Sequence, residues 1–129
     1  MADEGKQATV EAYFAAISSQ DVEALTAVFS PDGVMEDPVG TRPIQGRDGF
    51  QRFLDGITST FNEMILTPAE SFHAGGEVAV RWTAQGRSKE GVEVHYGGID
   101  VFSFDEEGRV TRMRGYWEPR ALFAQLKGA

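Results

Sequence analysis

Three side chains that could transfer protons lie where the sequence pattern predicts apolar surroundings. The first, Asp100, alternates with Phe102 and Phe104 in a segment of strand periodicity, so its carboxyl shares the face that these rings must bury. Burial disfavours a carboxylate and raises its pKa, and a carboxylic acid that keeps its proton can donate a hydrogen bond. Two structural alternatives exist: a bulge at Gly97-Gly98 that turns Asp100 outward, or a basic neighbour that pairs with it.

The other two candidates are Asp37 and Tyr13. Asp37 ends a short extended segment over residues 34–37 and is held in that geometry by Pro38, and the simpler interpretation of such a pair is a turn residue. Tyr13 lies on an apolar stripe of helical spacing, where a core role with a partnered hydroxyl is the simpler interpretation. Together with Asp100 they provide a carboxylate base, a phenol and a protonated acid. Proton transfer beside a carbonyl group requires these groups.

Three helices are predicted to come first and to carry part of this site. Each is predicted from apolar residues at helical spacing: Val10, Tyr13, Phe14 and Ile17; then Val22, Leu25, Val28 and Phe29; then Phe50, Phe53, Leu54, Ile57 and Phe61. Asp21 is a suitable N-cap for the second helix, and Pro31-Asp32-Gly33 is a turn signal expected to end it. The third helix is expected to begin after Gly46.

From about residue 62 the apolar period changes to two. Val78, Val80 and Trp82 alternate with polar residues, and breaks of hairpin length fall at 74–76, 89–91 and 105–108, so neighbouring strands should run antiparallel. Helices followed by strands predict an α+β domain spanning residues 1–129, with a curved antiparallel sheet, three N-terminal helices packed on it and a pocket inside.

Composition narrows the choice of ligand. The 129 residues carry 12 basic and 20 acidic side chains, a net charge of −8, which disfavours nucleic acid, anionic membranes and anionic substrates and favours a neutral ligand. There is no cysteine, and His73 and His95 have no acid at ligand spacing, so no metal site is predicted. Residues 1–6 lack the basic and apolar regions of a secretory signal, and no apolar run is long enough for a membrane span. We therefore expect a cytoplasmic protein.

The segment Glu36-Asp37-Pro38-Val39-Gly40, together with Gly98-Ile99-Asp100-x-Phe102-x-Phe104, closely resembles the bacterial steroid delta-isomerases, or ketosteroid isomerases. The resemblance extends over nearly the whole chain. It implies a cone-shaped fold of the nuclear-transport-factor-like type, a homodimer and catalysis without a cofactor. It also implies that Asp37 is the general base, and that Tyr13 and Asp100 donate hydrogen bonds to the substrate oxygen as a dienolate forms.

The expected reaction is therefore the movement of a β,γ double bond of a 3-oxo-steroid into conjugation. The predicted substrate-binding residues are Phe29, Phe53, Leu54, Trp82, Phe102, Met113 and Trp117. Leu54 and Phe29 stand where some members of the family have tyrosines. Two alternatives stay open: a polyketide cyclase-like enzyme on the same fold, and a non-catalytic binder of small apolar ligands. An epoxide hydrolase is a weaker alternative, because it would need an Asp–Arg–Asp set that we cannot place in the predicted pocket.

Overall fold

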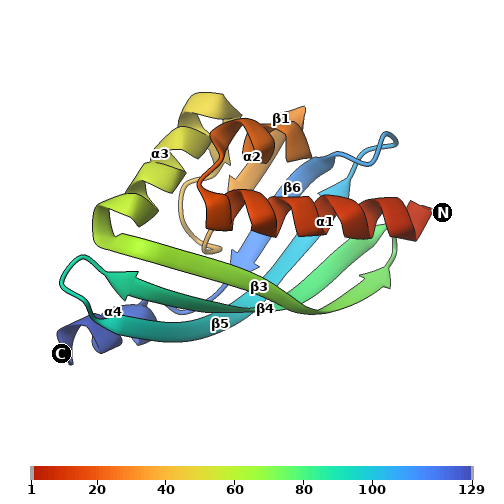
Figure 1. Ribbon diagram of the computed structural model, residues 1–129. Coiled ribbons are helices and arrows are strands. Elements are labelled where there is room, and N and C mark those ends of the chain that lie inside the picture. The colour runs from red at the N-terminus through yellow and green to blue at the C-terminus, as the bar shows by residue number, and fades with distance from the viewer. Residues whose placement is uncertain (1, 129) are drawn as a thin grey trace.

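A computed structural model describes residues 2–128, which form four helices and six strands (Figure 1). The order along the chain is α1 (Ala2–Ser19), α2 (Val22–Val28), β1 (Phe29–Glu36), β2 (Ile44–Gln45), α3 (Gly46–Thr60), β3 (Phe61–Ala74), β4 (Glu77–Ser88), β5 (Glu93–Phe104), β6 (Val110–Tyr116) and α4 (Pro119–Lys127). The three N-terminal helices lie on one side of a curved sheet (Figure 1), which confirms the predicted fold class.

The helix starts follow local sequence signals. Asp21 caps α2, because its Oδ1 accepts a hydrogen bond from the backbone N–H of Ala24 at 3.0 Å. Helix α3 begins at Gly46, as the sequence predicted. The expectation that Pro31-Asp32-Gly33 ends α2 is wrong: α2 ends at Val28, and these three residues lie inside β1, where its register against β6 shifts.

The sheet has the order β2-β1-β6-β5-β4-β3. The β3–β4, β4–β5 and β5–β6 pairs are antiparallel, as the hairpin-length breaks predicted. The pair β1–β6 is parallel, so the sheet is mixed rather than wholly antiparallel. The cause is the long connection from β1 to β6, which runs through β2, α3, β3, β4 and β5. It brings β6 to the edge of β1 that β2 does not occupy, and β6 runs in the same direction as β1.

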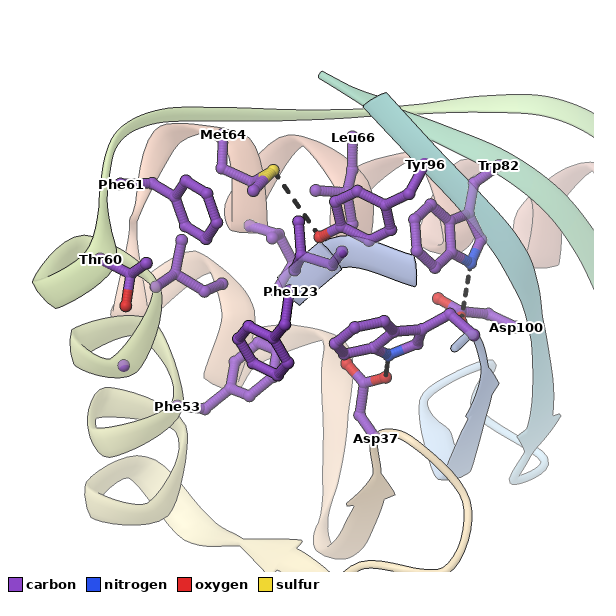
Figure 2. A pocket seen from close by; sticks show the side chains of 15 residues that line it. Asp37, Phe53, Thr60, Phe61, Met64, Leu66, Trp82, Tyr96, Asp100 and Phe123 are labelled. Atoms are coloured by element: carbon purple, nitrogen blue, oxygen red, sulfur yellow. Dashed lines mark hydrogen bonds between the residues drawn. The ribbon is translucent and has the colours of Figure 1, made fainter. Parts of the chain in front are cut away.

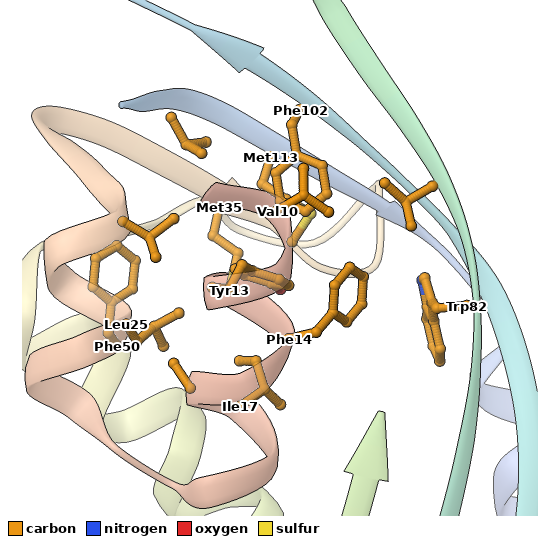
Figure 3. Packing of buried hydrophobic residues seen from close by; sticks show 14 of the residues in the cluster. Val10, Tyr13, Phe14, Ile17, Leu25, Met35, Phe50, Trp82, Phe102 and Met113 are labelled. Carbon is orange, nitrogen blue, oxygen red and sulfur yellow. The ribbon is translucent and has the colours of Figure 1, made fainter. Parts of the chain in front are cut away.

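The core lies between α1 and the concave face of the sheet (Figure 3). Tyr13, Phe14 and Ile17 point from α1 toward the sheet, and Phe102 and Met113 are fully buried against them. Tyr13 makes edge contacts with Phe14 and Phe102, at ring-centroid distances of 5.2 and 5.1 Å.

Helix α4 was not expected from the sequence. The side-chain amide of Gln125 fixes it to β5: the amide oxygen accepts from the backbone N–H of His95, and the amide nitrogen donates to the His95 carbonyl, both at 2.8 Å. These two bonds are made by a part of β5 that does not pair with β6, since the β5–β6 pairing begins at Ile99. None of the helices within residues 2–128 has the length and apolar character needed to cross a bilayer.

Candidate functional site

A cavity of about 240 Å³ lies between the sheet, α3 and α4 (Figure 2). Its wall is mostly apolar, and two carboxyl groups stand at one end. The lining residues are Ile17, Asp37, Phe53, Gly56, Ile57, Thr60, Phe61, Met64, Leu66, Trp82, Tyr96, Asp100, Trp117, Leu122 and Phe123. The predicted pocket is therefore present, and the segments that form it are far apart in sequence.

Asp37 immediately follows β1 and faces this cavity. The indole N–H of Trp117 donates a hydrogen bond of 2.6 Å to its Oδ1. Burial raises the pKa of Asp37 from 3.8 to about 6, against the opposing effect of the Trp117 hydrogen bond, which lowers it. A carboxyl with this pKa is largely ionised at neutral pH and is a stronger base than an exposed aspartate. It suits general base catalysis.

Asp100 lies in the middle of β5 and is only 2% exposed. The β4–β5 register runs without a shift through Gly97-Gly98, so no bulge turns Asp100 outward. The indole N–H of Trp82 donates to its Oδ1 at 2.9 Å. Burial, and then the negative charge of Asp37, raise the pKa of Asp100 well above its ordinary value, whereas the Trp82 hydrogen bond lowers it. Asp100 is therefore the weaker acid of the two carboxyls and holds its proton more readily than Asp37.

Gly115 on β6 allows the two carboxyl groups to converge. Asp100 is the register partner of Gly115, and a Cβ atom at position 115 would overlap Asp37 Oδ1 and lie 3.0 Å from Asp100 Oδ1. Gly98 has a similar effect on the indoles. A Cβ there would lie 2.8 Å from Trp82 Cζ2 and 2.9 Å from Trp117 Cβ. These two glycines leave the space in which both acid–indole pairs fit.

Tyr13 lies beside the cavity rather than on its wall. Its side chain is 1% exposed and is surrounded by Phe14, Phe29 and Phe102. Burial raises the pKa of Tyr13 well above its ordinary value, and the negative charges of Asp100 and Asp37 raise it further. The Tyr13 hydroxyl is thus within electrostatic range of both carboxyl groups and stays protonated.

The residues predicted to bind substrate divide into two groups. Phe53, Trp82 and Trp117 line the cavity. The other four are buried in the core and do not line it: Phe29, Leu54, Phe102 and Met113. Each lies on a strand or helix face that packs against another element, where periodicity marks a residue as buried but cannot distinguish core from cavity wall.

Several lining residues escaped the sequence analysis. Tyr96 stands on the inward face of β5, four residues before Asp100, and the period-two spacing that it shares with Val94 was the available signal. Leu122 and Phe123 come from α4, whose signals were the proline at its N-terminus and the apolar spacing of Leu122 and Leu126. No group of three or more His, Asp or Glu side chains within residues 2–128 is close enough together to hold a metal ion.

Residues 10–113 of the chain match the family of the SnoaL-like domain. The chain is 31% identical over 115 residues to the steroid delta-isomerase of Nocardioides simplex, covering 88% of this chain and 89% of that protein. It is 26% identical to the solved structure of SalBIII, an epoxide hydrolase/cyclase-like enzyme of pyran ring formation in the polyether salinomycin, with a TM-score of 0.79 and coverage of 94% and 97%.

A third relative is Rv0760c of Mycobacterium tuberculosis, solved in complex with estradiol-17beta-hemisuccinate. It is 21% identical, with a TM-score of 0.78 and coverage of 91% of this chain and 96% of its own. At this identity the likeness concerns the fold.

Proposed function

The chain belongs to the SnoaL-like domain family, and on that premise we propose that it is a steroid delta-isomerase. In this reaction a β,γ double bond of a neutral 3-oxo-steroid moves into conjugation with the ketone. The observation that carries the proposal is the pair of buried carboxyl groups at one end of an apolar cavity, each hydrogen-bonded by a separate indole. A general acid–base reaction on a neutral ketone needs one carboxyl as the base and one as the acid, and the higher pKa of Asp100 supports this division.

In the proposed mechanism Asp37 removes a proton from the carbon between the ketone and the alkene. Negative charge then develops on the ketone oxygen. The carboxyl of Asp100, in its acid form, donates a hydrogen bond to that oxygen from the cavity wall. The hydroxyl of Tyr13 is the second proposed donor, and this role requires the substrate oxygen to reach past the present cavity wall. The carboxyl of Asp37 returns the proton further along the same face of the ring, which forms the conjugated ketone. One base is therefore sufficient.

The indoles of Trp117 and Trp82 act as positioning groups in this proposal. Each donates to one oxygen of a carboxyl, at 2.6 Å for Asp37 and 2.9 Å for Asp100, and leaves the second oxygen for the substrate. Phe53, Trp82 and Trp117 offer flat apolar surfaces that suit a fused-ring ligand.

The test is an isomerisation assay with androst-5-ene-3,17-dione, followed by the rise in ultraviolet absorbance as the conjugated ketone forms. We expect turnover without added metal or nucleotide, and loss of turnover in Asp37→Asn. Binding of this steroid and of its conjugated product without any turnover would instead identify a non-catalytic binding protein and would reject the proposal.

A cyclase-like enzyme is the second candidate, favoured by the 26% identity to SalBIII. It would use Asp37 as the base on a different substrate, so only a substrate comparison separates the two. An epoxide hydrolase with an Asp–Arg–Asp set is disfavoured, because none of the described residues that line the cavity is an arginine.

We also infer a homodimer formed through the convex face of the sheet. Ile65, Ile99 and Tyr116 are exposed large apolar residues on three different strands. The strand pairings Ile65↔Gln85, Gln85↔His95 and Ile99↔Tyr116 place them on this one face, opposite the cavity. Light scattering after size-exclusion chromatography should give the mass of two chains, and Ile99→Asp should give one. A monomeric parent protein would contradict this inference.

A further inference from the structure

The polar side chains of the cavity form two groups. Asp37 and Asp100 stand at one end with their indole partners, where the reaction is proposed to occur, and Tyr96 and Thr60 lie away from them. The hydroxyl of Tyr96 points away from Asp100, toward Met64 and the apolar part of the wall (Figure 2). A hydroxyl in such a place needs a reason, because an apolar residue would cost less to bury.

The Tyr96 hydroxyl has a weak internal partner. It donates to the sulfur of Met64 at 3.7 Å, and a thioether is a poor acceptor. A carbonyl or hydroxyl oxygen of a ligand would accept at about 2.7–2.8 Å and would form a stronger bond. Burial and the negative charges of Asp37 and Asp100 raise the pKa of Tyr96, so the phenol stays a donor throughout the physiological range.

The ring of Tyr96 is fixed relative to the reacting end. It meets Trp82 edge-on at a centroid distance of 5.7 Å, and Trp117 at 5.5 Å with a tilt of 45°. These are the two indoles that hold Asp100 and Asp37. This packing holds the hydroxyl in a fixed position relative to both carboxyl groups. A residue that selects rigid ligands by the separation of their two oxygen atoms would need such a fixed position.

We propose that the hydroxyl of Tyr96 recognises a second oxygen atom of the substrate, remote from the reacting ketone. The preferred ligand is then a rigid, neutral, apolar ketone that carries a further ketone or hydroxyl group. This inference rests on the proposed function for the orientation of the substrate. Tyr96 is a specificity-determining residue in this proposal, because it touches the substrate away from the reacting atoms.

The test compares two conjugated steroids that differ by one oxygen: androst-4-ene-3,17-dione and androst-4-en-3-one. Their dissociation constants are measured from the fluorescence of Trp82 and Trp117, both of which line the cavity. Tyr96→Phe keeps the ring and its contacts and removes the hydroxyl. We expect it to weaken binding of the dione about 2- to 12-fold, the range for the loss of one hydrogen bond, and to change binding of the mono-ketone less than about 2-fold.

Ser19→Ala is the control for loss of a hydroxyl, since Ser19 is exposed at the end of α1 and does not line the cavity. It should leave the ratio of the two dissociation constants at the parent value. Equal losses for both ligands in Tyr96→Phe would overturn the inference and assign the hydroxyl to packing. No loss for either ligand, or no binding of either by the parent protein, would also overturn it. Because the measurement needs no turnover, absence of isomerisation would reject the proposed function and leave this result to stand separately.

Discussion

Replacing Asp37 by asparagine should remove activity and stabilise the fold at the same time. The pKa of Asp37 is raised from 3.8 to about 6 by burial. At 1.36 kcal/mol per pKa unit, ionisation of this carboxyl is about 3 kcal/mol less favourable in the folded protein than in the unfolded chain. Asparagine has nearly the same shape, can still accept from the Trp117 indole and carries no charge. It therefore avoids this cost.

Because the pKa of Asp37 is raised in the folded state, the stability gained by Asp37→Asn depends on pH. Between about pH 4 and 6 the folded state binds more protons than the unfolded state, so the free energy of unfolding falls as pH rises through this range. Below about pH 4, Asp37 is protonated in both states and the variant has no such advantage. Above about pH 6 the advantage is complete. The free energy of unfolding of Asp37→Asn should then exceed that of the parent by up to about 3 kcal/mol, an upper limit because the charge of Asp37 also changes the proton affinity of the neighbouring Asp100.

The assay is urea unfolding of both proteins at pH 4 and pH 8, with turnover measured at pH 8. Removal of a general base should lower kcat about 10²- to 10⁴-fold. Asp32→Asn is the matched control, because Asp32 is exposed on β1, and it should change neither stability nor rate appreciably. The reasoning would be refuted if the difference in unfolding free energy between Asp37→Asn and the parent were the same at pH 4 and pH 8. The carboxylate would then not be destabilised by its surroundings.

The other predictions concern groups that hold the two acids in place. Trp117→Phe removes the hydrogen bond that lowers the pKa of Asp37, so the acidic limb of the rate–pH profile should move above about pH 6; an unmoved limb would contradict the role of Trp117. Trp82→Phe should instead move the alkaline limb upward by raising the pKa of Asp100, and a shift confined to the acidic limb would argue against it. Gly115→Ala should lower kcat at least about 10-fold, because its methyl group would overlap Asp37 Oδ1. An unchanged near-ultraviolet circular dichroism spectrum would show that the variant is folded. Activity equal to that of the parent would show that the carboxyl positions are not critical.

Much of the fold could be predicted from periodicity because both periods are local properties of the chain. The stripe containing Phe50 and Leu54 requires a helix with one buried face, and the alternation of Val78, Val80 and Trp82 requires a strand with one buried face. The parallel pairing of β1 with β6 and the docking of α4 were missed. Each depends on backbone groups that meet from distant segments, as with Gln125 and His95, and no local pattern records such a meeting.

The sequence by itself determined that Asp100 shares a strand face with Phe102 and Phe104 unless a bulge intervenes, and that Asp37 ends an extended segment, because side-chain direction follows backbone geometry. Only the tertiary structure decided that the two carboxyls converge over Gly115, that separate indoles hold them, and that Tyr96 rather than Phe102 or Met113 lines the cavity. The physical reason is that alternation distinguishes inside from outside, whereas the split of the two pKa values comes from charge, distance and exclusion of water, which arise only when β1, β5 and β6 are assembled.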